Sequence, residues 1–158
     1  MRVIYFLFLF AALHLKSNAQ KIDKWKITDV ASLIEKSDSV LVINFWATFC
    51  VPCIEEIPDL IKYTTLHKKD KVKLYLVSLD LPEYYPNKIN KFVAKKKFNA
   101  NIAWLNETNA DYFCPIISED WSGAIPATLI VNKKKGYRQF YEKKLSAPEI
   151  QKAIEAAL

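Results

Sequence analysis

Two cysteines separated by two residues, Cys50 and Cys53, are the side chains of this sequence whose spacing most directly suggests chemistry. In Cys-Val-Pro-Cys the sulfurs can meet in a small ring at the first turn of a helix. The first cysteine then faces unpaired backbone N–H groups and the positive end of the helix dipole, which lowers a thiol pKa from about 8.5 towards about 7 or below. Cys50 would attack a disulfide as a thiolate, and Cys53 would resolve the mixed disulfide that forms. The spacing therefore predicts thiol-disulfide exchange.

Three other roles for a Cys-x-x-Cys pair make different demands on the sequence. A zinc site needs four ligands, commonly from two such pairs, whereas only Cys114 and His67 remain in the chain beyond the leader, far from pair spacing. A c-type haem needs histidine directly after the second cysteine, and Ile54 stands there. A purely structural disulfide stays open, although a stapling bridge normally closes a longer loop. We expect no metal and no cofactor other than a redox-active Cys50–Cys53 disulfide.

The first 19 residues have the pattern of a secretory signal peptide. Arg2 gives a positive start, Val3 to Leu13 are apolar without interruption, and Ser17-Asn18-Ala19 supplies small residues for cleavage after Ala19. The alternative is an uncleaved membrane anchor, but the apolar run is shorter than the ~20 residues that span a bilayer. The leader predicts a periplasmic or otherwise extracytoplasmic protein, where disulfide chemistry is favoured.

Composition excludes several other function classes. The chain has 158 residues, 51% of them hydrophobic, so residues 20–158 are enough for one domain with a core. Its two glycines cannot form the glycine-rich loops that bind nucleotide phosphates. The net charge of +6 is mildly basic, but the lysine runs 95–97 and 133–135 lack the interleaved aromatics of a nucleic-acid platform. We therefore expect no nucleic-acid partner, and membrane contact only through a leader that is not cleaved.

Alternating strand and helix patterns surround the cysteine pair. The dense apolar run Val40 to Ala47 predicts a strand buried on both faces, and Cys53 to about His67 predicts a helix that Pro58 should kink. Thr28 should cap a helix over Asp29 to Lys36. The other expected strands are 24–27, 72–79, 102–105, 127–131 and 137–141, the last two forming an antiparallel hairpin; the other expected helices are 86–98, 109–113 and one opened by a capping box at 146–149. This order predicts an α/β fold with a central mixed sheet and helices on both faces.

Two segments carry a resemblance to a known family. Asn44 to Cys53 reads Asn-Phe-Trp-Ala-Thr-Phe-Cys-Val-Pro-Cys, and residues 123–128 read Gly-Ala-Ile-Pro-Ala-Thr before a strand. The chain resembles the thioredoxin superfamily, in particular its TlpA/ResA-like extracytoplasmic thiol-disulfide oxidoreductases. The resemblance implies a thioredoxin-like fold in which Pro126 is cis and faces the redox pair, with the Ile125 backbone free to pair with an extended substrate. The alternative is a trans proline that merely begins a strand.

The resemblance also suggests supporting roles for three residues. Glu56 lies one helical turn after Cys53, where related proteins carry a glutamate that could take the buried thiol's proton; otherwise it is a solvated first-turn residue. Asn44 stands where cytoplasmic thioredoxins have a buried, proton-accepting aspartate, so that role is missing or has moved to Glu56. Trp46 is expected to pack beside the disulfide as part of the substrate site, or to be ordinary core. The remaining thiol, Cys114, is expected to be buried and inert; the alternative is a regulatory or intermolecular thiol.

The function implied by the resemblance is an extracytoplasmic thiol-disulfide oxidoreductase acting on protein substrates as a reductant. A membrane thiol donor would recycle Cys50 and Cys53, and substrates could include apocytochrome thiols or misoxidised proteins. Three alternatives stay open: a disulfide oxidase or isomerase, a thiol peroxidase, and a non-catalytic thioredoxin-like binding module. The peroxidase is disfavoured because peroxiredoxins place threonine three residues before the reactive cysteine, where this chain has Ala47.

Overall fold

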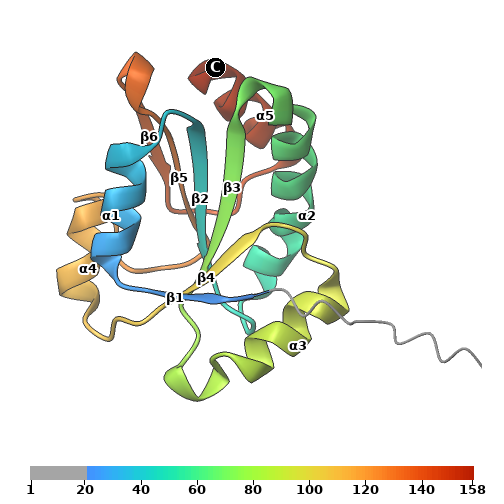
Figure 1. Ribbon diagram of the computed structural model, residues 1–158, viewed down its shortest axis with the longest axis vertical. Helices are drawn as coiled ribbons and strands as arrows, with labels where there is room; N and C mark the ends of the chain where they lie inside the picture. Colours follow the sequence, from blue (N-terminus) through green and yellow to red (C-terminus); the bar gives the residue numbers. More distant parts are fainter. Residues whose placement is uncertain (1–20) are drawn as a thin grey trace, which may run out of the picture.

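The strand that leads to the cysteine pair, β2 (Val40–Trp46), is buried along its whole length, as its unbroken apolar sequence predicts. In the computed structural model, which describes residues 21–158, this strand lies inside a six-stranded sheet (Figure 1). The strand order is β1-β4-β3-β2-β5-β6. Strands β1, β4, β3 and β2 run parallel, while β5 is antiparallel to β2 and to β6. The predicted mixed sheet and its final hairpin are confirmed.

The helices and strands alternate along the chain up to that hairpin. The remaining strands are β1 (Asp23–Trp25), β3 (Val72–Ser78), β4 (Asn101–Leu105), β5 (Ala127–Asn132) and β6 (Tyr137–Tyr141). The α-helices are α1 (Ile27–Lys36), α2 (Val51–Leu66), α3 (Asn87–Lys96), α4 (Ala110–Ile117) and α5 (Ala147–Ala157). Short 3₁₀ turns are η1 (Lys68–Asp70), η2 (Pro82–Tyr84) and η3 (Lys133–Lys135).

Alternation along β2 builds a separate apolar layer on each face of the sheet. Val42 and Trp46 point to the face covered by α2, α3 and α5, and Cys50 and Cys53 belong to the same apolar layer. Ile43 and Phe45 point to the opposite face, which α1 and α4 cover. Figure 1 shows α1 and α4 on one side of the sheet and α2 and α5 on the other. Helices on both faces are thereby confirmed, and the cysteine pair belongs to the α2 side.

Two helix boundaries differ from the sequence-based expectations. Helix α1 begins at Ile27 with Lys26 in the cap position, so Thr28 lies inside the helix and the predicted threonine cap is wrong. The first amides of α1 find acceptors elsewhere: the Lys26 N–H donates to Asp29, and the Ile27 N–H donates to Glu107, a residue distant in sequence.

Helix α4 is longer than the predicted segment 109–113 and runs on to Ile117. It passes through Pro115, a residue that usually ends helices because it lacks an N–H. The extension buries Cys114 and Ile117 together with Phe113 against the sheet, and this burial favours the additional turn.

The predicted leader, residues 1–19, lies outside the described residues, so the boundary between leader and domain stays a prediction. Within residues 21–158, no helix has the length and apolar character needed to cross a membrane.

Candidate active site

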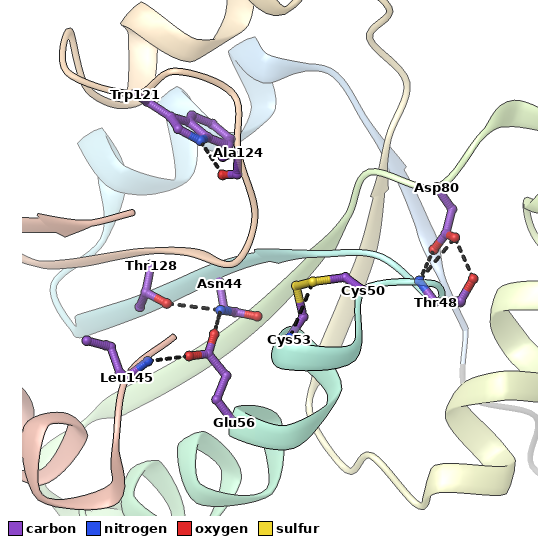
Figure 2. Close-up of a disulfide and its surroundings, with 10 residues drawn as sticks. All are labelled: Asn44, Thr48, Cys50, Cys53, Glu56, Asp80, Trp121, Ala124, Thr128 and Leu145. Atoms are coloured by element: carbon purple, nitrogen blue, oxygen red, sulfur yellow. Dashed lines mark hydrogen bonds between the residues drawn. A yellow bond between two sulfur atoms is a disulfide. The ribbon is translucent and has the colours of Figure 1, made fainter. Parts of the chain in front are cut away.

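Cys50 and Cys53 lie at the junction between the loop after β2 and the start of α2, and they form a disulfide (Figure 2). Their Cα atoms are 5.3 Å apart. Cys50 caps the helix, and its sulfur accepts a hydrogen bond from the Cys53 N–H at 3.3 Å. Cys50 is 8% exposed and Cys53 is 0% exposed. An incoming thiol or disulfide therefore has access to Cys50, while the body of the protein covers Cys53.

A buried carboxylate, Asp80, holds the loop that carries Cys50. It follows β3 by two residues and accepts hydrogen bonds from the backbone N–H of Thr48 at 3.1 Å and from the Thr48 hydroxyl at 2.6 Å. The hydroxyl of Ser78 donates to it at 2.7 Å, and the indole N–H of Trp104 donates to its backbone carbonyl at 2.7 Å. Asp80 thus links the end of β3 to Thr48, which follows β2 and lies two residues before Cys50.

Sequence reasoning missed Asp80, although a signal for it exists. Parallel neighbouring strands end at the same edge of a sheet, and β2 and β3 pair residue by residue up to Trp46 and Ser78. A carboxylate just after β3 can therefore reach the loop just after β2. The segment Ser78-Leu79-Asp80 would have predicted this anchor had the β2–β3 pairing been assumed.

Glu56 lies on the other side of the disulfide and is 1% exposed, so the interpretation of it as a solvated first-turn residue is wrong. One carboxylate oxygen accepts from the Asn44 side-chain amide at 2.8 Å, and the other accepts from the Leu145 N–H at 2.7 Å (Figure 2). Burial raises the pKa of Glu56 from 4.5 to about 7, against the opposing effect of these two hydrogen bonds and of the Lys144 charge. The side chain can therefore exchange a proton near neutral pH.

The neighbouring carboxylate, Glu55, has the surface role that its sequence position suggested. It is exposed and pairs with Lys144, with half of each side chain open to solvent. The two adjacent glutamates thus point to different environments, because successive positions on a helix lie about 100° apart.

Asn44 connects Glu56 to the sheet. Its side-chain amide donates a second hydrogen bond, at 2.9 Å, to the hydroxyl of Thr128, its cross-strand partner on β5. Both residues are fully buried. Thr128 was missed as a site residue because nothing in the sequence pairs it with Asn44 until the register of β2 and β5 is known.

The Ile125–Pro126 peptide bond is cis, as the family resemblance implied. Pro126 immediately precedes β5, and the next residue, Ala127, pairs with Phe45 near the end of β2. The segment therefore lies at the sheet edge from which the cysteine loop emerges. Ile125 is half-buried and contacts the apolar layers on both faces of the sheet.

Trp46 is not a surface residue, so its predicted part in the substrate site is wrong. It is 0% exposed and packs against Phe92 and Phe98, with ring centroids 5.9 Å away in each case. The side chains that do present apolar surface next to Cys50 are Phe49 at 65% and Val51 at 63% exposure. Sequence reasoning missed both residues, because exposure at the turn after a buried strand cannot be deduced from the apolar pattern.

The third thiol, Cys114, is free and buried, which agrees with the expectation of a bystander. Burial, assisted by the nearby Glu142 and Asp111 charges, raises its pKa to about 11, so it stays protonated at neutral pH. Among residues 21–158, no group of three or more histidine, cysteine, aspartate or glutamate side chains is arranged to hold a metal ion.

The sheet, the covering helices, the helix-capping disulfide and the cis-proline segment define a thioredoxin-like protein. The structure is similar to that of a thioredoxin-related protein from Neisseria meningitidis serogroup B, with a TM-score of 0.66 and 25% sequence identity; the match covers 78% of this chain and 89% of that one. The chain belongs to the AhpC/TSA family, which matches residues 11–139.

Two relatives carry names that describe redox chemistry. Sporulation thiol-disulfide oxidoreductase A of Bacillus subtilis is 26% identical over 93 residues, or 59% of this chain and 53% of that protein. Thiol-disulfide oxidoreductase ResA of Geobacillus kaustophilus is 22% identical over 114 residues, or 72% of this chain and 60% of that protein. The matches thus span less than two thirds of the length of either relative.

Proposed function

We propose that this chain is an extracytoplasmic thiol-disulfide oxidoreductase that reduces disulfides in protein substrates through Cys50 and Cys53. The observation that carries the proposal is the asymmetry of the pair: Cys50 retains access to solvent at the start of α2, whereas Cys53 is buried with a titratable carboxylate nearby. The names of the two relatives support the same chemistry.

The reaction begins from the dithiol. The Cys50 thiolate attacks one sulfur of a substrate disulfide, so that bond breaks, a mixed disulfide forms and one substrate sulfur leaves as a thiolate. The N–H of Cys53, which points at the Cys50 sulfur at 3.3 Å, supplies a hydrogen bond that favours the thiolate. The oriented amides at the start of α2 act in the same direction.

Resolution requires Cys53 to lose its proton inside the protein. Glu56, with a pKa of about 7, is ionised in a substantial fraction of molecules at neutral pH and can accept that proton. The Cys53 thiolate then attacks the Cys50 sulfur, the second substrate sulfur leaves and takes a proton from solvent, and the protein is left as the disulfide. Two electrons have passed from the protein to the substrate.

A substrate chain would bind at the surface around Cys50. The backbone of Ile125, two residues before the start of β5, offers hydrogen-bonding groups to an extended segment. Phe49 and Val51 add apolar surface on the loop and the helix start. Leu81, 56% exposed just after the Asp80 anchor, extends it.

The reductive direction, the compartment and the electron donor complete the proposal. The signal-peptide pattern of residues 1–19 favours a location outside the cytoplasm. There, a membrane protein with a dithiol would return two electrons to the Cys50–Cys53 disulfide after each turnover. Apocytochrome thiols and misoxidised proteins are the substrate classes we expect.

The primary test is insulin reduction by dithiothreitol, with the mature wild-type protein and its Cys50→Ser variant. We expect the wild type to accelerate insulin precipitation and the variant to match the uncatalysed rate. Equal rates for the two proteins, with both folded by circular dichroism, would reject the enzymatic proposal in favour of a binding module.

Two further measurements separate the rival activities. Equilibration with glutathione gives the reduction potential. A value of about −180 mV or higher would support an oxidase or isomerase instead of a reductant. Peroxide consumption by the reduced protein tests for a thiol peroxidase. We expect the wild type to consume peroxide no faster than a Cys50→Ser control.

A further inference from the structure

We propose that the side-chain oxygen of Asn44, Oδ1, accepts a hydrogen bond from the Cys53 thiol whenever the disulfide is reduced. The inference deepens the proposed function and rests on it, since it concerns the dithiol state of the exchange cycle. It assigns to Asn44 a direct contact with a reacting atom, distinct from the proton acceptance proposed for Glu56.

The starting point is an unpaired polar atom in the core. Asn44 is 0% exposed, and both hydrogen bonds of its side chain come from the amide nitrogen, to Glu56 and to Thr128. Its Oδ1 is buried and has no hydrogen-bond partner, one of two such side-chain atoms within residues 21–158, the other being the Trp46 indole nitrogen. Leaving a buried acceptor unpaired is costly, so the protein gains if another state supplies a donor.

The surroundings fix the direction in which that oxygen points. The amide nitrogen of Asn44 donates to Glu56, as the ionised carboxylate requires because it can only accept, and the amide oxygen therefore faces away from Glu56. In Figure 2 the oxygen points toward the Cys53 end of the disulfide. Strand alternation agrees, because Val42 and Trp46, on either side of Asn44, lie in the same apolar layer as Cys53.

Reduction creates the missing donor. A disulfide carries no hydrogen on sulfur, whereas reduction by a donor dithiol breaks the S–S bond, adds two electrons and two protons, and leaves the donor as a disulfide. Cys50 then ionises toward the helix amides, while the buried Cys53 keeps its proton and can donate it to Asn44 Oδ1. This bond stabilises the neutral form of Cys53 and thereby reserves the nucleophilic role for Cys50.

The bond has a second consequence for the redox equilibrium. It exists in the dithiol and is absent in the disulfide, so it favours the reduced protein. A neutral hydrogen bond of ordinary strength changes an equilibrium constant by about fivefold. Removing the acceptor should shift the glutathione equilibrium toward the disulfide by about that factor.

The test is the infrared S–H stretching band of Cys53 in the Cys50→Ser/Cys114→Ala protein, which retains one thiol. We expect the band to lie below that of a cysteine model compound in an apolar solvent, and to move to higher frequency when Asn44→Leu is added. Thr128→Val, which removes a partner of the Asn44 nitrogen and leaves Oδ1 in place, should leave the band where it is.

A Cys53 band at the position of the free model thiol would overturn the inference, as would a band that Asn44→Leu does not move. If Asn44→Leu fails to fold, the band of the parent protein still decides, and Asn44→Asp, which keeps an acceptor, should retain the low frequency. The band is measured without substrate, so a wild-type protein inactive on insulin would reject the proposed function while the infrared result stood independently.

Discussion

Two buried carboxylates, Asp80 and Glu56, flank the redox pair, and they differ in the hydrogen bonds that they accept. Asp80 accepts hydrogen bonds from the backbone and the hydroxyl of Thr48 and from the hydroxyl of Ser78, so its oxygens link the cysteine loop to the end of β3. Glu56 accepts only two, from Asn44 and Leu145, and burial raises its pKa to about 7. Figure 2 shows them on opposite sides of the disulfide. The same functional group serves as a fixed anchor on one side and, in our proposal, as a proton acceptor on the other.

The comparison teaches that burial alone does not define a catalytic acid or base. Asp80 at 3% and Glu56 at 1% exposure are almost equally covered. What differs is the set of hydrogen-bond donors. Asp80 accepts from Thr48 on the cysteine loop and from Ser78 at the end of β3. Glu56 accepts from Asn44 and Leu145, and it lies on the helix that carries the thiol it would serve.

The largest effect that we expect from the contrast between Glu56 and Asp80 is on the pH dependence of the unfolding free energy. The unfolded Glu56 loses its proton near 4.5 and the folded one near 7, so the folded state binds more protons in between. Stability from this group is therefore fully present below about pH 4.5 and is lost as pH rises toward 7, by about 3 kcal/mol. Urea unfolding from pH 4 to 8 should show this decline in the wild type and not in Glu56→Gln; parallel curves would refute it.

The next effect is on catalysis. Glu56→Gln removes the acceptor for the Cys53 proton, and general base catalysis of this kind contributes on the order of 10²-fold. Insulin reduction at pH 7 should slow by that order. The inflection near pH 7 that we expect in the wild-type pH profile should be absent from the variant. A variant with wild-type rates and an unchanged pH profile would remove Glu56 from the mechanism.

On the other side of the pair, Asp80→Ala should weaken the fold around Cys50. It leaves the donors on Thr48 and Ser78 without their acceptor, at a cost of about 2 kcal/mol in unfolding free energy. Urea unfolding of the oxidised protein measures the loss. Glu83→Ala, at an exposed position in the following turn, is the matched control and should change the unfolding free energy little. Equal losses in the two variants would contradict the anchoring role of Asp80.

The smallest effect sharpens the comparison between adjacent residues. Glu55→Gln breaks a half-exposed ion pair with Lys144, which contributes about 0–1 kcal/mol. We expect unfolding free energies and insulin reduction rates close to those of the wild type. Slowing comparable to that of Glu56→Gln would show that charge near the helix start, and not the buried carboxylate, governs the reaction.

Sequence alone predicted the parts of the site that are local in the chain. The strand into Cys50, the helix after it and the hairpin from Ala127 to Tyr141 follow from patterns a few residues long. The cis state of Pro126 came from the family resemblance.

The parts that escaped prediction depend on residues distant in the chain. The N–H of Leu145, 89 positions after Glu56, donates to the Glu56 carboxylate. Without this contact, the sequence could not decide whether Glu56 is buried or solvated. Asp80 required the register of β2 with β3, and Thr128 that of β2 with β5. The buried strand and the core alternative for Trp46 were predicted correctly, but its substrate-site role was not. Nothing in the apolar run shows that Phe49, three residues later, is the aromatic that reaches the surface.

The central claim is that Cys50 is the attacking sulfur and Cys53 the resolving one. It is tested most directly by incubating the reduced Cys53→Ala and Cys50→Ala proteins, each also carrying Cys114→Ala, with a disulfide-bonded protein substrate and weighing the products by mass spectrometry. The account predicts a stable mixed disulfide through Cys50 in the Cys53→Ala protein and little or none in the Cys50→Ala protein. Equal trapping by both, or trapping through Cys53 alone, would contradict it.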